Sequence, residues 1–336
     1  LNGNQSRFYG GGIYAYGYYT LTLADFRVND NLNTANSGGA GGAGLQLNGV
    51  SSGGAVRLSD GEIAGNLSPA TGGGIDARGV DLSLTRVRVE GNRAYNAGGI
   101  LSSSTARPAS LIIDSSLISA NVAITLGAGG LWNNGNATLV VTGTRIISNM
   151  SATSAGALYN SGSITFTQAT FTNSQILSNT AVTAGAGAIF NNGTLRFANS
   201  VIAGNRALPD ASSFGGAINN VGGVVDIADS LVEGNTADTG AGIVNYLGIA
   251  RLSGSTVRAN AALSGDGGDE LFAGYGRYFG AQAALGDGLT PAQLAPQYFD
   301  RFLPVMPLEQ LVKLFGGLPD RFQDIYAALL SAMVPA

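Results

Sequence analysis

Short runs of alternating apolar and polar residues fill most of the first 262 positions, and most runs end alike. An apolar residue is followed three positions later by an asparagine, as at Ile176 and Asn179. Alternation with a period of two predicts β-strands that bury one face. The segments that end in this way are Phe26–Asn29, Ile63–Asn66, Val89–Asn92, Ile118–Asn121, Ile146–Asn149, Ile176–Asn179, Ile202–Asn205, Val232–Asn235 and Val257–Asn260.

From Asn66 onward these asparagines recur 25 to 30 residues apart, and a fixed period in this range indicates a repeat architecture. We assign Asn29 to an earlier copy, which a longer glycine-rich insertion separates from Asn66. A second motif follows in most copies. It is a pair of glycine or alanine residues and then an aliphatic residue, which lies about eight to thirteen positions after the asparagine. Its copies are Gly73-Gly74-Ile75, Gly98-Gly99-Ile100, Gly129-Gly130-Leu131, Gly156-Ala157-Leu158, Gly187-Ala188-Ile189, Gly216-Ala217-Ile218 and Ala241-Gly242-Ile243.

Short strands without a helical period between them exclude alternating strand–helix units. We therefore predict a mainly β fold, a right-handed parallel β-helix of about nine coils over residues 1–262. The aromatic-rich run at 10–26, GGGIYAYGYYTLTLADF, predicts strands of an irregular first coil. The recurrent asparagines are expected to stack in one row, in which their amides satisfy backbone groups at a turn. We expect further turns with positive φ at Asn133-Asn134-Gly135, Asn160-Ser161-Gly162 and Asn191-Asn192-Gly193.

Composition limits the chemistry that the chain can perform. It has 52 glycines and 11% charged residues, but 45% of its residues are apolar, which argues against disorder. The absence of cysteine and histidine excludes disulfides, thiolate metal sites and imidazole catalysis. Residues 1–262 carry 13 arginines and 13 acids, which gives no basic footprint for nucleic acid. No apolar run is long enough to span a membrane. Because the chain starts at Leu1, we expect the true N-terminus to be missing, and an export signal is neither indicated nor excluded.

The repeat over residues 10–262 resembles the repeats of polymorphic outer-membrane proteins and of related autotransporter passengers. The resemblance implies an exported module at the cell surface or in the extracellular space. It also implies a mostly non-catalytic role in adhesion or as a scaffold, with a surface glycan or a protein as ligand. The overlong coil before Asn66 and the phenylalanine at Phe26 depart from the pattern of that group.

A β-helical enzyme that acts on polysaccharides is an alternative, because acids on neighbouring coils could form a catalytic pair. The position six residues before each recurrent asparagine never carries acids on two neighbouring coils. At this position we expect Asp60 and Arg86 to pair at the surface. The strongest acidic group within the coils is Asp226, Asp229 and Glu233. The residues at the tested position are Asp60, Arg86, Ser115, Gly143, Asn173, Asn199, Asp229 and Gly254.

Residues 263–278, LSGDGGDELFAGYGRY, resemble almost letter for letter the signature of the synthetase domain of glutamine-hydrolysing asparagine synthetases. That resemblance implies an ATP-dependent ligase of the cytoplasm, which converts aspartate to asparagine with ATP and Mg²⁺. It implies that Asp266 lies near the activated aspartyl carbonyl and that Asp269 is a magnesium ligand. It also implies that Ser264 and Gly265 bind the nucleotide.

The remainder of the synthetase machinery is missing from this sequence. No Ser-Gly-Gly-x-Asp-Ser pyrophosphate loop occurs, and no cysteine exists for a glutaminase. We therefore expect residues 263–336 to be an incomplete synthetase fragment that is inactive and binds no cofactor by itself. We expect it to be helical, with a first helix at Asp269–Ala281 that covers the open end of the last coil, and further helical patterns at 307–315 and 320–334.

Two other interpretations of the junction remain. Gly265–Gly276 roughly follows the calcium-binding nonapeptide pattern, although that pattern needs several tandem copies. The string Leu-Ser-Gly-Asp-Gly-Gly could also continue a coil, so the join lies where both sequence types agree. This suggests a chimeric chain. The hypotheses left open are a surface β-helix with an inactive tail, an asparagine synthetase, and a polysaccharide-active enzyme.

Overall fold

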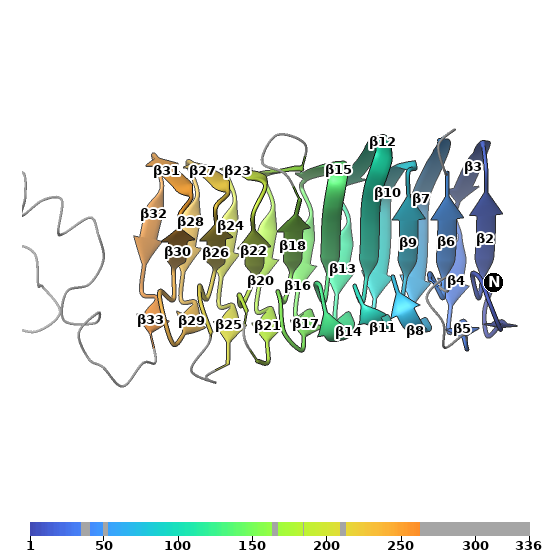
Figure 1. The fold of residues 1–336 in the computed structure, drawn as a ribbon, viewed down its shortest axis with the longest axis horizontal. Coiled ribbons are helices and arrows are strands. Elements are labelled where there is room, and N and C mark those ends of the chain that lie inside the picture. Colours follow the sequence, from blue (N-terminus) through green and yellow to red (C-terminus); the bar gives the residue numbers. More distant parts are fainter. Residues whose placement is uncertain (35–40, 50–52, 163–166, 184, 209–212, 263–336) are drawn as a thin grey trace, which may run out of the picture. The chain divides into compact units, whose positions relative to one another are not determined.

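The computed structural model describes residues 1–34, 41–49, 53–162, 167–183, 185–208 and 213–262. These residues form a parallel β-solenoid of about eight turns, against the nine or so coils expected from the repeats (Figure 1). All of them belong to one unit, Leu1–Ser264. The mainly β, parallel architecture is therefore confirmed, and the described residues contain no helix. The helices expected at Asp269–Ala281, 307–315 and 320–334 lie outside the described residues.

One side of the solenoid is a 10-stranded parallel sheet of short strands, along the lower edge of Figure 1. Each strand comes from a different turn, so neighbours in the sheet are separated by a whole turn of chain. Its strands are β1 (Gln5–Ser6), β5 (Leu32–Asn33), β8 (Leu67–Thr71), β11 (Arg93–Asn96), β14 (Val122–Leu126), β17 (Met150–Ser151), β21 (Thr180–Ala181), β25 (Arg206–Ala207), β29 (Thr236–Ala237) and β33 (Ala261–Ala262).

The other strands form one 23-stranded sheet that covers the two remaining sides of the solenoid. Two long strands, β12 (Ile100–Asp114) and β15 (Leu131–Thr142), run along both sides and join them into one sheet. The second side follows the glycine–alanine motif and consists of β2 (Ile13–Tyr16), β6 (Leu45–Asn48), β9 (Ile75–Arg78), β12 (Ile100–Asp114), β15 (Leu131–Thr142), β18 (Leu158–Ser161), β22 (Ile189–Asn191), β26 (Ile218–Val221) and β30 (Ile243–Tyr246). The third side ends at the recurrent asparagines. It adds β3 (Tyr19–Ala24), β4 (Arg27–Asn29), β7 (Gly54–Ala64), β10 (Asp81–Glu90), β13 (Leu117–Ser119), β16 (Arg145–Ile147), β19 (Gln168–Thr172), β20 (Gln175–Leu177), β23 (Thr194–Ala198), β24 (Val201–Ala203), β27 (Val224–Ala228), β28 (Leu231–Glu233), β31 (Ile249–Ser253) and β32 (Thr256–Arg258).

The core is built from rows of aliphatic side chains, one from each turn. Ile75 pairs in register with Ile100, and Ile100 pairs with Leu131, so the aliphatic residues of the second motif stack directly on one another. The apolar residues before the asparagines do the same, as at Ile118 and Ile146. All five are buried. Each such side chain contributes about 1.5–3 kcal/mol, and the repetition of this row drives the stacking.

The recurrent asparagines are buried and are linked from turn to turn by hydrogen bonds. The Nδ2 of Asn121 donates to Oδ1 of Asn149 over 2.9 Å, and the Asn121 main-chain N–H donates to the same oxygen. The Asn121 Nδ2 also donates to the Val89 carbonyl. Each amide thus satisfies backbone groups at a corner where no strand partner is present. We call this file the asparagine row, and its members are Asn4, Asn31, Asn66, Asn92, Asn121, Asn149, Asn179, Asn205, Asn235 and Asn260. All of them are buried except the two end members, Asn4 and Asn260.

The row begins at Asn4, whose main chain and side chain both donate to Oδ1 of Asn31. The next member is Asn31, so the assignment of Asn29 to this position was wrong. Asn31 donates from its main chain and its side chain to Oδ1 of Asn66. The Val28 carbonyl accepts from Asn66 Nδ2, as the Ile63 carbonyl accepts from Asn92 Nδ2 one turn later. Val28 is therefore the apolar residue of the motif, and this copy lies two residues further along than we expected.

A second row of asparagines begins the segments in which we expected turns, at Asn133, Asn160 and Asn191. These residues are buried within strands, and Nδ2 of each donates to Oδ1 on the next turn over 2.6–2.8 Å. The row continues through Asn220 to Asn245. The expected positive φ is found at Gly135 and Gly162, with values of 70° and 147°, but not at Gly193. The inward direction of the asparagines has a simple cause. In a solenoid an amide that repeats on successive turns gains partners when it points inward.

Glycine in the second motif is required by close approach. A Cβ placed on Gly74 would lie 2.8 Å from the Gly99 carbonyl oxygen and 3.1 Å from Nδ2 of Asn92. The last described turn is different, because nothing among the described residues covers its core positions. Leu252 and Val257 are exposed, whereas their register partners Ile227 and Val232 are buried.

We predict that Asn149→Ala strongly destabilises the solenoid. The substitution leaves the two Asn121 donors without their acceptor in a dry site, and each unsatisfied buried group costs about 1–3 kcal/mol. A loss of about 2–4 kcal/mol is expected from denaturant unfolding of the full chain. The matched control is Asn136→Ala in β15, where the side chain is half-buried and a change within about 0.5 kcal/mol is expected. Equal effects of the two substitutions would contradict the role of the asparagine row.

Candidate functional site

The position that we compared for catalytic acids lies six residues before each recurrent asparagine. Its backbone is in the left-handed conformation in every coil compared. Asp60, Arg86 and Asp229 have φ of 53°, 54° and 48°, and the glycines at this position have similar values. Asparagine, aspartate and glycine tolerate this conformation best. Aspartates are therefore found here for their backbone geometry. The expected surface pair is confirmed, because Arg86 Nε and Asp60 Oδ1 lie 2.6 Å apart. Their mutual hydrogen bond is the main reason that the pKa of Asp60 is lowered.

The other acids of the strongest cluster are engaged by arginines on neighbouring turns. Asp226 lies 3.0 Å from Arg251, and Glu233 lies 3.2 Å from Arg258. In the part of the chain that the structure describes, no group of three or more acidic residues could hold a metal ion. The arrangement gives these side chains a structural explanation, since cross-turn pairs of opposite charge favour the observed register.

An exposed row of tyrosines begins at the first turn. In β2 alternate residues point outward, and this places Tyr14 and Tyr16 on the surface, followed by Tyr18 just beyond the strand. Their exposed fractions are 43%, 63% and 82%. We call these three residues the tyrosine row. Side chains of this size are usually covered when they have only a structural role, so the row is the first candidate for a binding surface.

Neighbouring aromatic side chains extend the tyrosine row. The rings of Tyr9 and Tyr14 are stacked, with centroids 4.9 Å apart and planes inclined by 15°. The Tyr14 and Tyr16 centroids are 6.3 Å apart. Burial, followed by the nearby Tyr9 and Tyr16 hydroxyls, raises the pKa of Tyr14. Phe8 is also exposed. The result is an extended aromatic surface with several ring faces in contact with solvent.

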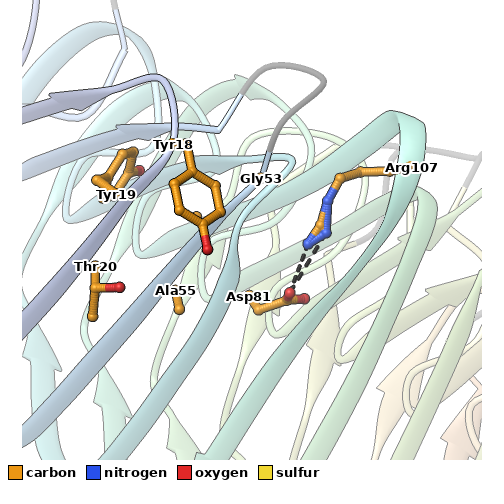
Figure 2. Close-up of a pocket in the computed structure, with 8 residues that line it drawn as sticks. Tyr18, Tyr19, Thr20, Gly53, Ala55, Asp81 and Arg107 are labelled. Carbon is orange, nitrogen blue, oxygen red and sulfur yellow. Dashed lines mark hydrogen bonds and ion pairs between the residues drawn. The ribbon is translucent and has the colours of Figure 1, made fainter.

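An open hollow of about 320 Å³ adjoins the end of this row. Its floor is formed by Thr20, Ala55 and Asp81, which are register neighbours on three successive turns. Figure 2 shows Tyr18 on one side of this floor and Arg107 on the other. The small side chain of Ala55 leaves open space between Tyr18 and Arg107. The volume of the hollow is at the lower end of the range for small-ligand sites, roughly 300–1,000 Å³.

The charges in the hollow compensate one another. Arg107 Nη2 donates to Asp81 Oδ2 over 2.6 Å (Figure 2), and the Ser110 N–H and hydroxyl donate to the other carboxylate oxygen. Burial raises the pKa of Asp81, but these hydrogen bonds and the Arg107 charge outweigh it and lower that pKa. Gly53 is needed beside this pair, because a Cβ there would lie 3.0 Å from the Arg107 guanidinium carbon. The hollow is therefore polar without a net charge.

The ring of Tyr19 lies behind this hollow, because it packs inward against the core together with Leu21 and Leu23. Its hydroxyl is buried, and no hydrogen bond of normal geometry joins it to a described residue. Desolvation raises the pKa of Tyr19 to about 12, although the nearby Asn48 backbone acts in the opposite direction. Tyr19 therefore supports the hollow from within and presents no polar group to it.

This surface was not predicted as a site. Tyr14, Tyr16 and Tyr18 were assigned only to strands, although a spacing of two residues within one strand already places Tyr14 and Tyr16 on one face. The residues predicted as a site, Ser264, Gly265, Asp266 and Asp269, lie outside the described residues. Their assignment to ATP, Mg²⁺ and catalysis stays a prediction. Among the described residues, no helix is long and apolar enough to cross a membrane.

We predict that Tyr19 makes stability depend on alkaline pH. An unfolded tyrosine ionises near pH 10, whereas Tyr19 in the fold ionises at about 12. The stabilisation is therefore complete below pH 10 and is lost as the pH rises towards 12. Denaturant unfolding between pH 9 and 12 should show a steeper loss for the native chain than for Tyr19→Phe. Half-buried Tyr159 provides the control, because Tyr159→Phe should leave the Tyr19 contribution in place. Identical pH profiles for native and Tyr19→Phe chains would contradict this assignment.

Comparison with known proteins bears on the end of the chain. A family model described as asparagine synthase matches residues 228–329. No curated protein and no solved structure matches the chain. Residues 228–262 of the matched range lie in the described solenoid, from the last residue of β27 to the end of β33. The resemblance inferred from LSGDGGDELFAGYGRY is thereby confirmed, and residues 228–329 are similar to asparagine synthase.

Proposed function

We propose that the solenoid is a non-catalytic binding module that acts in adhesion or as a scaffold at the cell surface or in the extracellular space. The observation that supports this most directly is the exposed tyrosine row beside a polar, uncharged hollow. Exposed aromatic residues are typical of interaction surfaces. The resemblance of the repeats to those of surface proteins agrees with the same role. Its ligand is a surface glycan or a protein.

The distribution of charge favours binding over polysaccharide cleavage. Asp60, Asp81, Asp226 and Glu233 each face an arginine within 3.2 Å. A retaining or inverting hydrolase needs two carboxyl groups that face the same bond, about 5–10 Å apart. Hydrogen bonds from Arg86 lower the pKa of Asp60, and the hydrogen bonds and charge around Asp81 outweigh burial and lower its pKa. These two acids are therefore poorly suited to donate protons. The polysaccharide-active alternative therefore has no observation in its favour.

We further propose that the chain is chimeric and that its synthetase-like part is inactive alone. The family match begins at residue 228, whereas the same residues up to 262 form solenoid strands in this chain. A range that satisfies both sequence patterns is consistent with a join between two unrelated genes. The pyrophosphate loop and the glutaminase cysteine that the resemblance requires are absent from the 336 residues.

The adhesion proposal predicts that beads coated with the full chain adhere to mucin, fibronectin or collagen surfaces under flow. Albumin-coated beads are the control. The same preparation should release no unsaturated sugar from polygalacturonate or alginate in the presence of Ca²⁺, which is followed by ultraviolet absorbance. No retention above albumin on any of the surfaces would contradict the proposal. Release of unsaturated products would replace it with the enzyme alternative.

The second candidate is an ATP-dependent asparagine synthase, which the family match over residues 228–329 favours. We predict no such activity, because the loop that would hold the pyrophosphate is missing. Purified full chain with aspartate, ATP, Mg²⁺ and ammonia should form no AMP or pyrophosphate above a blank without protein. Product formation that Asp269→Ala abolishes would establish the synthase and show that another segment binds ATP.

A further inference from the structure

We propose that the tyrosine row and the adjoining hollow bind a neutral oligosaccharide. Its pyranose rings would stack on Tyr14, Tyr16 and Tyr18, and the hydroxyls of the last ring would enter the hollow between Tyr18 and Arg107. The inference rests on the proposed binding function and specifies the class of ligand. It concerns residues of the first turns only.

The aromatic surface fits the apolar faces of sugars. A pyranose ring presents axial C–H bonds on its face, and these pack against the electron-rich face of an aromatic ring. Tyr14 and Tyr16 alternate along β2 with centroids 6.3 Å apart, a spacing comparable with the length of one sugar unit. Stacking of Tyr9 on Tyr14 with nearly parallel planes holds one of these rings in place. A preorganised ring loses little entropy when a ligand binds.

The polar groups of the hollow fit hydroxyls better than charged groups. A hydroxyl both donates and accepts, so it can donate to the Asp81 carboxylate and accept from the Arg107 guanidinium. Thr20 at the floor offers a further hydroxyl. The Asp81–Arg107 pair leaves no net charge. A phosphate or uronate group would gain from Arg107 but would be repelled by Asp81, which favours an uncharged ligand.

The hollow is also placed where a chain of sugars could continue from the row. Tyr18 links the two, since it follows Tyr16 just after the bend at Gly17 and forms one wall of the hollow (Figure 2). Its ring is 82% exposed, so a ligand can contact it without any movement of the solenoid. The site therefore has an open end along β2 and a closed end against Arg107. Such a shape fits the end of an oligosaccharide rather than the middle of a branched one.

The test is calorimetric titration of the full chain with cellohexaose, maltohexaose and chitohexaose, and with trigalacturonate as an acidic comparison. At least one neutral oligosaccharide should bind. Tyr16→Ala and Tyr18→Ala each remove a ring on which a sugar would stack, so each should weaken sugar binding by at least about fivefold. Tyr246→Ala is the matched control, because Tyr246 is 60% exposed at the far end of the described solenoid. It should change the affinity by less than about twofold.

Thr20→Val separates the hollow from the row. It keeps the shape of the side chain and removes the exposed hydroxyl at the floor of the hollow, so the fold should persist while neutral oligosaccharides of six units bind at least several-fold more weakly. Failure of all three neutral sugars to bind would overturn the inference. Binding of trigalacturonate alone, or sugar binding that is unchanged in Tyr16→Ala and Tyr18→Ala, would also overturn it. Adhesion to fibronectin or collagen without sugar binding would leave the proposed function intact and assign it a protein ligand.

Discussion

The hydrogen bond from one asparagine side chain to the next turn is the interaction on which the rest of the solenoid depends. At the corner after Ile118 or Ile146 the backbone leaves one strand before it begins another, and its polar groups face the core. The amides of Asn121 and Asn149 satisfy these groups and one another. A shift by one residue would leave buried donors unpaired. The asparagine row therefore fixes the register in which all aliphatic rows stack.

Fixed register also determines what the surface can present. Outward residues on successive turns fall into rows, so Thr20, Ala55 and Asp81 meet although they are distant in the sequence. At several turns of the third side these rows pair acids with arginines, as at Asp60 and Arg86 and at Glu233 and Arg258. At the first turn they place tyrosines beside a polar hollow. The proposed binding surface thus differs from the other turns in its outward residues, whereas its inward residues follow the same pattern as theirs.

The sequence predicted those features that repeat, because each turn repeats the same physical requirement. Ile63 and Asn66 are placed correctly by period alone. The assignment of Asn29 to the asparagine row was wrong because Phe26 and Val28 both alternate with polar residues. Only the hydrogen bond from Asn66 to the Val28 carbonyl shows which of the two belongs to the motif. The hollow could not be predicted, since Arg107 reaches Asp81 across a turn of the chain. The burial of the Tyr19 hydroxyl depends equally on neighbours that no local pattern specifies.

The central claim is that the solenoid continues through residues 228–262, although this range begins the match to asparagine synthase. Hydrogen exchange of the full chain, followed by mass spectrometry, tests it most directly. The account predicts that the amides of β27 and β28 exchange as slowly as those of β23 and β24, since all four strands pair on both sides. Rapid exchange throughout β27 and β28, with β23 and β24 still protected, would contradict it.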